Sequence, residues 1–131
     1  MEETEQEKLI RYLKGVRYVV INACHGGYGL SQEAEFLYLK KSLIAYTTEP
    51  RESRYDTERY GPLIKVNGKI WYSSDISRDD PVLVSVVREL GEKANGDFAE
   101  LKIVEIPASV DWQIDEYDGR EWVAEAHRTW D

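Results

Sequence analysis

Residues 17–42 read RYVVINACHGGYGLSQEAEFLYLKKS, and they predict a buried strand, a glycine-rich loop and a helix, in that order. The run over 18–23 is apolar and largely β-branched, which favours a strand. The glycines that follow allow positive φ angles, and Ser31 can cap a helix over 32–41. A helix that begins directly after such a loop is a common place for an anion to bind.

The loop and the first turn of this helix therefore predict a binding site for phosphate or carboxylate groups. A helix N-terminus presents backbone N–H donors that have no partner within the helix. We expect the ligand contacts to come from His25, Gly26, Gly27, Tyr28 and Ser31. The alternative is that the glycines only form a tight turn.

The composition predicts one domain in a reducing cytoplasm. A chain of 131 residues that is 42% hydrophobic can form one core but is short for two. Cys24 is the only cysteine, no apolar run approaches the length of a membrane span, and the first residues lack the pattern of a signal peptide. The net charge of −8 opposes binding to long nucleic acid or to anionic membranes. Any nucleotide ligand should therefore be small.

Positive charge gathers in the middle of the chain, whereas residues 105–131 hold eight acidic residues and two arginines. We expect the middle segment to face the anionic ligand through Arg51, Arg54 and Arg59. Tyrosines beside these arginines could stack on a base. The alternative is an ordinary solvated loop, because acidic residues lie among the arginines.

The whole pattern predicts an α/β (α+β) fold: a single compact domain over 16–131, preceded by an N-terminal helix over 1–15. We expect a mixed sheet, two hairpins and about three helices. The clearest signals are the Asn67-Gly68 turn within 63–72, and a helix that begins at Asp79 or Asp80 with Pro81 and closes at Asn95-Gly96. Further expected elements are a strand over 43–47, a polar loop over 50–61 and a strand over 101–106. A second hairpin is expected over 112–130, with its turn at Asp118-Gly119. The alternative to the last strand of this hairpin is a helix over 121–128.

Three segments resemble a widespread group of small, mostly uncharacterised phage-encoded proteins: INACHGGYGLSQEA, RDDPVLVSVVRELGEKANGDFAELKIVEIP and IDEYDGREWVAEAHRTW. The resemblance implies a phage origin and a compact α/β domain, and it brings no catalytic assignment. Val20-Ile21-Asn22-Ala23 is also similar to the strand that opens the ADP-ribose site of macrodomains, although the loop here is shorter. This analogy adds Asn22 to the expected ligand contacts.

Catalytic groups are few. Cys24 and His25 are adjacent, so on an extended backbone their side chains point to opposite sides and form no dyad. The sequence has no serine-nucleophile elbow, no phosphate-binding GxxxxGK[ST] and no paired spacing of zinc ligands. His127 could meet His25 and Asp118 around a metal, but histidines in this context more often make polar contacts. We expect no catalytic residue, no metal and no cofactor.

These features predict a phage protein of the infected bacterial cytoplasm that sequesters a small anionic nucleotide without turning it over. A cyclic oligonucleotide or an ADP-ribose-like defence signal would fit this description. One alternative is an acidic protein that inhibits a host protein through its C-terminal hairpin, and another is a small nucleotide hydrolase. We also expect a homo-oligomer, because a second copy would cover apolar surface and strand edges.

Overall fold

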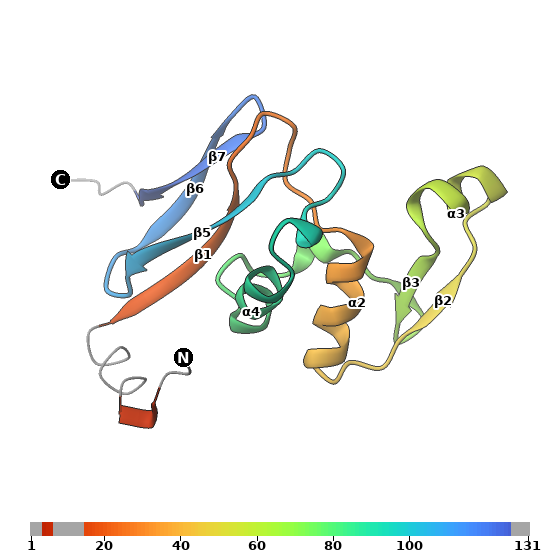
Figure 1. Cartoon of the computed structure of the whole chain (residues 1–131), viewed down its shortest axis with the longest axis horizontal. Coiled ribbons are helices and arrows are strands. Elements are labelled where there is room, and N and C mark those ends of the chain that lie inside the picture. Colours follow the sequence, from red (N-terminus) through yellow and green to blue (C-terminus); the bar gives the residue numbers. More distant parts are fainter. Residues whose placement is uncertain (1–3, 7–14, 127–131) are drawn as a thin grey trace.

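Residues 4–6 and 15–126 are described by a computed structural model. Within these ranges the chain forms one compact α/β domain, with three α-helices and seven short strands in small open sheets (Figure 1). None of the helices in the described ranges is long and apolar enough to cross a bilayer. The helix expected over 1–15 lies mostly outside the described residues.

The centre of the fold is an antiparallel pair of strands, β1 (Val16–Asn22) and β5 (Leu101–Pro107). Their register joins Val16 to Pro107 and Asn22 to Leu101. The last four residues of β1 are buried, as the run of β-branched side chains predicts. Both expected strands are confirmed, with differences of one or two residues at their ends.

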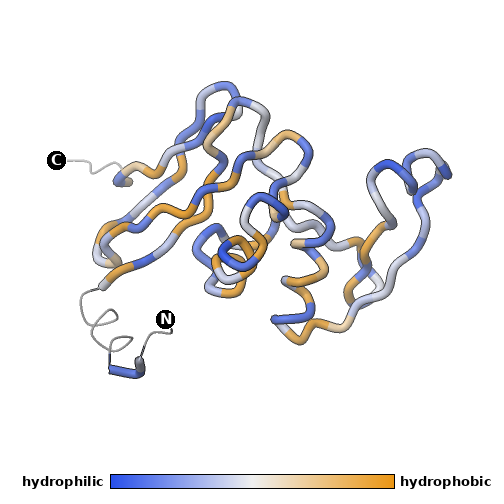
Figure 2. Tube along the Cα trace, in the orientation of Figure 1, coloured by the Kyte–Doolittle hydropathy of each residue, from blue (hydrophilic) through white to orange (hydrophobic). Residues whose placement is uncertain are grey.

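Two helices supply most of the core: α4 (Pro81–Leu90) packs against β1 and β5, and α2 (Gln32–Lys41) packs against α4. In α2 the Ser31 hydroxyl accepts a hydrogen bond from the Ala34 N–H at 3.1 Å, so the expected helix and its cap are confirmed. In α4 Asp80 caps the N-terminus. The buried faces of α2, α4 and β1 form one hydrophobic cluster, and Figure 2 shows hydrophobic residues along these elements.

The end of α4 differs from the expected closure at Asn95-Gly96. The α-helix stops at Leu90, because Gly91 takes a φ of 57° and ends the α-helical hydrogen-bonding pattern. The chain then tightens into a short 3-10 helix, η2 (Gly91–Ala94). Ala94 in this segment is fully buried, so the apolar pattern continues although the α-helix does not.

The C-terminal hairpin pairs β6 (Trp112–Tyr117) with β7 (Arg120–Glu125), and β7 lies against β1. Asp118 and Gly119 both have positive φ angles, which confirms the expected two-residue turn. Residues 120–125 are a strand, so the alternative helix is wrong over this part. The strand expected to continue to residue 130 runs outside the described residues after 126.

Residues 47–72, which we call the arm, extend away from the rest of the molecule (Figure 1). Its sheet has the order β2 (Thr47–Glu49), β3 (Leu63–Val66), β4 (Lys69–Ile70). Positive φ angles at Asn67 and Gly68 confirm the expected hairpin turn. After the arm, a 3-10 turn η1 (Ser73–Asp75) returns the chain toward α4.

Two expectations in and before the arm are wrong. The segment expected as a polar loop contains α3 (Arg54–Tyr60), which Ser53 caps by accepting a hydrogen bond from the Asp56 N–H. This helix buries none of its residues, so it has no apolar stripe for a sequence pattern to reveal. The strand expected over 43–47 begins only at Thr47, because Leu43 has a φ of 56° and lies in the turn after α2.

Candidate functional site

A cleft of about 270 Å³ lies between the end of the glycine-rich loop, the start of α2 and the arm. Its walls combine aromatic rings, one guanidinium group, one carboxyl group and several hydroxyls. They are formed by Tyr28, Gly29, Leu30, Gln32, Glu35, Arg51, Pro62, Leu63, Ile64, Ile70, Trp71, Tyr72, Ser73 and Ser74. Such a mixture of flat apolar surface and a few polar groups is typical of a small-molecule site.

Arg51 provides the positive charge of the cleft. Its Nε donates a hydrogen bond to the Gly61 carbonyl at 2.8 Å, and its backbone N–H donates to the Thr57 hydroxyl at 2.8 Å. The guanidinium also lies 6.0 Å from the centre of the Tyr60 ring. These contacts fix the side chain from its Nε end, which leaves the Nη groups free of hydrogen bonds within the described part of the chain.

Glu35 is the acidic residue of the cleft and lies in the first turn of α2. Burial raises the pKa of its carboxyl group above the ordinary value. A hydrogen bond from Ser73 and the positive charge of Arg51 act in the opposite direction without cancelling the effect of burial. The cleft therefore holds a partly desolvated carboxyl group close to a fixed arginine.

Tyr28 forms part of the cleft wall, and its ring is in contact with Arg78. The Arg78 guanidinium lies 3.3 Å from the centre of the Tyr28 ring, which is a cation–π contact. Burial raises the pKa of the Tyr28 hydroxyl, Arg78 opposes this rise and Glu121 adds to it. The phenol is thus a neutral donor, and in the described structure its hydroxyl is buried without a hydrogen-bond partner.

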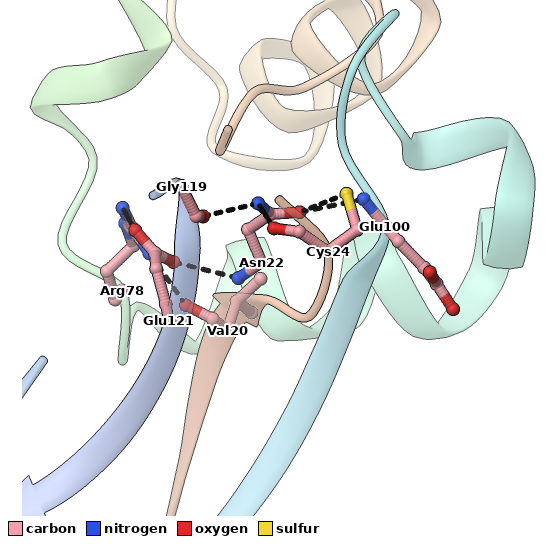
Figure 3. A network of polar contacts seen from close by, with 7 residues as sticks. All are labelled: Val20, Asn22, Cys24, Arg78, Glu100, Gly119 and Glu121. Carbon is pink, nitrogen blue, oxygen red and sulfur yellow. Dashed lines mark hydrogen bonds and ion pairs between the residues drawn. The ribbon is translucent and has the colours of Figure 1, made fainter. Parts of the chain in front are cut away.

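Arg78 is in turn fixed by Glu121, and both residues meet Asn22 in a network that Figure 3 shows. Two nearly parallel hydrogen bonds join Arg78 to Glu121, Nη1 to Oε1 at 2.7 Å and Nη2 to Oε2 at 2.9 Å. Glu121 Oε1 also accepts from the Asn22 backbone N–H at 2.8 Å. We call Asn22, Arg78 and Glu121 the clamp, because it joins β1, the segment before α4 and β7.

The Asn22 side chain is fully buried, and all of its polar groups are bonded within the protein. Its Nδ2 donates to the carbonyls of Cys24 and Gly119, each at 2.7 Å, and its Oδ1 accepts from the Glu100 N–H at 2.8 Å. Figure 3 shows how these bonds tie the glycine-rich loop to the hairpin turn. The structure places Asn22 in this network and outside the cleft walls.

The glycines of the loop have different surroundings. A Cβ at Gly26 would overlap the carbonyl oxygen of Phe98, so this position requires glycine for close packing. Gly27 has a φ of 103° with open space where a Cβ would stand, so there the backbone angle requires glycine. His25 is exposed, and its Nδ1 lies 3.2 Å from the Asp118 carbonyl. None of these three residues lines the cleft.

The remaining expected site residues make contacts elsewhere. The Ser31 hydroxyl donates to the Lys93 carbonyl at 2.6 Å while it caps α2. Arg54 pairs with Glu58 at 3.0 Å within α3, and Arg59 pairs with Asp97 at 3.3 Å. Of the residues expected at the site, the structure therefore brings Tyr28 and Arg51 together in the cleft, and it leaves the others outside its walls.

Sequence reasoning missed Gln32, Glu35, Trp71 and Ser73 as cleft residues. A partial signal exists for the first two, because residues three apart in a helix share a face. No feature of the local sequence indicates that this face of α2 packs against the segment that follows the β3–β4 hairpin.

The described residues contain no group of three His, Cys, Asp or Glu side chains placed to hold a metal ion. His127, which was considered as a metal ligand, lies outside the described ranges. The Cys24 thiol donates to Asn22 Oδ1 at 3.3 Å and to the Phe98 carbonyl at 3.2 Å. These acceptors do not activate a thiol, since a reactive cysteine needs a basic or positively charged neighbour.

Comparison with known proteins gave no relative: no protein-family model, no curated protein and no solved structure matches this chain.

Proposed function

We propose that this protein binds and sequesters a small anionic nucleotide in the cleft and does not turn it over. The observation that supports the proposal is the meeting of Tyr28, Trp71 and Tyr72 with Arg51 in one depression. Aromatic rings stack on bases, and a guanidinium group forms charge-assisted hydrogen bonds with phosphate oxygens. The two chemical parts of a nucleotide thus each have a suitable partner.

The size of the cleft limits what it can enclose. Its volume of about 270 Å³ is slightly below the range of about 300–1,000 Å³ that is usual for small-molecule pockets. We therefore expect it to enclose one nucleotide unit. A cyclic oligonucleotide or an ADP-ribose-like molecule would place one base and an adjoining phosphate in the cleft and extend beyond it.

Binding without turnover agrees with the chemistry of the walls. The cleft contains no cysteine, no histidine and no lysine among its lining residues. Glu35 has no second carboxyl group beside it in the lining that would complete an acid–base pair. In a phage protein, tight binding alone would suffice to remove a defence signal from the infected cell.

The proposal is tested by heating the purified protein and analysing the released compounds for ultraviolet absorption and mass. The protein should also melt at a higher temperature with members of a panel of cyclic dinucleotides, cyclic trinucleotides and ADP-ribose derivatives. A ligand at one hundred times its dissociation constant adds about 2.7 kcal/mol of stability. Chromatography of the ligand after long incubation should recover it unchanged.

Two arginine variants separate cleft binding from a general effect of charge. Arg51→Ala should lower affinity about 10- to 150-fold, the range expected for a lost charge-assisted hydrogen bond. Arg54→Ala also removes one positive charge from the arm, but the Arg54 side chain pairs with Glu58 outside the cleft. This variant should therefore bind the nucleotide with the affinity of the unaltered protein. Equal affinities of the two variants, or no binding of any nucleotide by the unaltered protein, would refute the proposal.

A second candidate function, binding to a host protein, is favoured by the exposed face of the C-terminal hairpin. The register pairs Asp115 with Trp122 and Tyr117 with Arg120, so the two aromatic side chains share one face. Tyr117 is 73% exposed and Trp122 is 44% exposed. Exposed aromatic residues among carboxylates are typical of protein interaction sites. Trp122→Ala should abolish such an interaction and leave nucleotide binding intact.

A further inference from the structure

Glu35 gives the cleft a feature that phosphate binding by itself does not require. It is the acidic residue among the lining, and it lies on α2, while Arg51 belongs to the arm. An ionised carboxylate repels a phosphate group, so the phosphate of a bound nucleotide should turn toward Arg51. The base is then the part of the ligand that is left to face Glu35.

The hydrogen-bonding capacity of Glu35 is only partly used. Ser73 donates one hydrogen bond to it, whereas an ionised carboxylate offers about four acceptor positions on its two oxygens. An ionised carboxylate cannot donate. A base that faces Glu35 must therefore present hydrogen-bond donors to the carboxylate oxygens. A base with an acceptor atom there would place its lone pair against a lone pair of a carboxylate oxygen, which is unfavourable.

The common bases differ in this respect. Guanine presents two neighbouring donors on its Watson–Crick edge, N1–H and the 2-amino group, which match the two oxygens of a carboxylate. Adenine and cytosine each present an amino donor beside a ring-nitrogen acceptor. Uracil presents one donor between two carbonyl acceptors. Reading a base through this edge is the usual means of recognition when the base is outside a duplex.

We propose that the ligand carries a guanine base, and that Glu35 selects it by accepting hydrogen bonds from N1–H and the 2-amino group. This inference rests on the proposed binding of a nucleotide in the same cleft. Tyr28, Trp71 and Tyr72 supply rings on which the base stacks, and such stacking tolerates every base. Specificity therefore falls to the carboxylate.

The test compares guanine and adenine ligands by calorimetry, with GMP against AMP and cyclic di-GMP against cyclic di-AMP. The unaltered protein should prefer the guanine member by about 10- to 150-fold, as expected for hydrogen bonds to a charged group. IMP lacks the 2-amino group and should bind with an intermediate affinity.

Glu35→Gln is the informative variant, because an amide presents one acceptor and one donor, which suits adenine. It should reduce the preference for guanine to below about threefold or reverse it. The variant is expected to fold, because glutamine has nearly the size of glutamate and keeps a carbonyl oxygen that can accept from Ser73. Glu33→Gln is the matched control, since Glu33 lies in the same first turn but does not line the cleft.

The outcomes distinguish this inference from the proposal on which it rests. If the unaltered protein binds guanine and adenine ligands equally well, or if Glu35→Gln leaves the guanine preference unchanged, the inference is wrong while nucleotide binding stands. If the unaltered protein binds none of the four ligands and none of the wider panel, both fail. A loss of the guanine preference in Glu35→Gln but not in Glu33→Gln supports the inference.

Discussion

Replacing Glu121 with alanine should be among the most destabilising single changes in this protein. Glu121 receives three hydrogen bonds, two from Arg78 and one from the Asn22 backbone N–H. Its side chain is 8% exposed and that of Arg78 is 21% exposed. The change therefore leaves a largely buried guanidinium group with only the Val20 carbonyl as acceptor, at 3.2 Å, and a buried N–H donor that has lost its acceptor.

The expected cost follows from these two losses. Removing one partner of a buried ion pair costs about 3–5 kcal/mol, and an unsatisfied buried N–H costs about 1–3 kcal/mol. Water can reach the exposed part of Arg78, so the cost of breaking the ion pair should be near its lower limit of about 3 kcal/mol. We expect a total cost of about 4–6 kcal/mol, from a total stability of about 5–15 kcal/mol.

Urea unfolding followed by tryptophan fluorescence measures this loss. The control is Glu116→Ala, because Glu116 is paired with Glu121 in the hairpin register but is exposed. It should change the free energy of unfolding by less than about 0.5 kcal/mol. If Glu121→Ala costs no more than this control, the clamp does not hold the hairpin on the domain.

Acid should weaken the same interaction. Burial raises the pKa of Glu121, but the hydrogen bonds from Arg78 and Asn22 and the charge of Arg78 outweigh burial and lower it below its ordinary value. A carboxyl group whose pKa is lower in the folded state stabilises the fold above its unfolded-state pKa of about 4.3. This contribution is lost as the pH falls through the folded-state pKa. The difference in stability between the unaltered protein and Glu121→Ala should therefore shrink in that window.

Three further outcomes are expected. Tyr28→Phe removes a buried hydroxyl that has no partner within the described structure, so in urea unfolding it should leave stability unchanged or raise it by about 1 kcal/mol. Gly26→Ala should lower the free energy of unfolding by about 2 kcal/mol or more, because the new Cβ overlaps the Phe98 carbonyl. Gly27→Ala should lower it by about 1–2 kcal/mol, because only the backbone angle is unfavourable for alanine. Thermal melts of the two variants should show the larger loss of stability in Gly26→Ala. Light scattering should give at least twice the mass of one chain, and a single-chain mass at all concentrations would exclude the expected homo-oligomer.

Much of the fold could be predicted because its signals are local. Ser31 and Asp80 mark the starts of α2 and α4, and the Asn67-Gly68 and Asp118-Gly119 turns mark two hairpins. Each signal depends on the conformation of two to four neighbouring residues, so it can be recognised without knowledge of the tertiary contacts. The arm helix α3 has a cap of the same kind at Ser53, but it buries none of its residues, so no apolar periodicity accompanies that cap.

The cleft could be predicted only in part, because it is formed by segments that meet through tertiary packing. Tyr28 and Arg51 were chosen for their chemistry and do line it. Asn22 was expected by analogy with macrodomains and Gly26 as part of the glycine-rich loop. Their surroundings are set instead by contacts with Glu100, Phe98 and the hairpin turn, more than seventy residues away in the sequence. No local sequence pattern indicates which distant backbone groups will form hydrogen bonds with the Asn22 amide, or which will pack so closely on residue 26 that only glycine fits.

Tyr28 connects the clamp to the cleft, because its ring lies against Arg78 on one side and forms part of the cleft wall. A base that stacks on this ring is therefore positioned, in part, by the bond between Arg78 and Glu121. Loss of Glu121 would leave the Arg78 guanidinium with only its 3.2 Å hydrogen bond to the Val20 carbonyl, so the ring would be held less firmly. The loss should therefore weaken nucleotide binding although Glu121 does not line the cleft. Loss of the Glu35 charge should act on the base directly and leave the clamp intact. We therefore expect separable effects of the two carboxylates: replacing Glu121 should lower stability and displace the ring, and replacing Glu35 should change the choice of base.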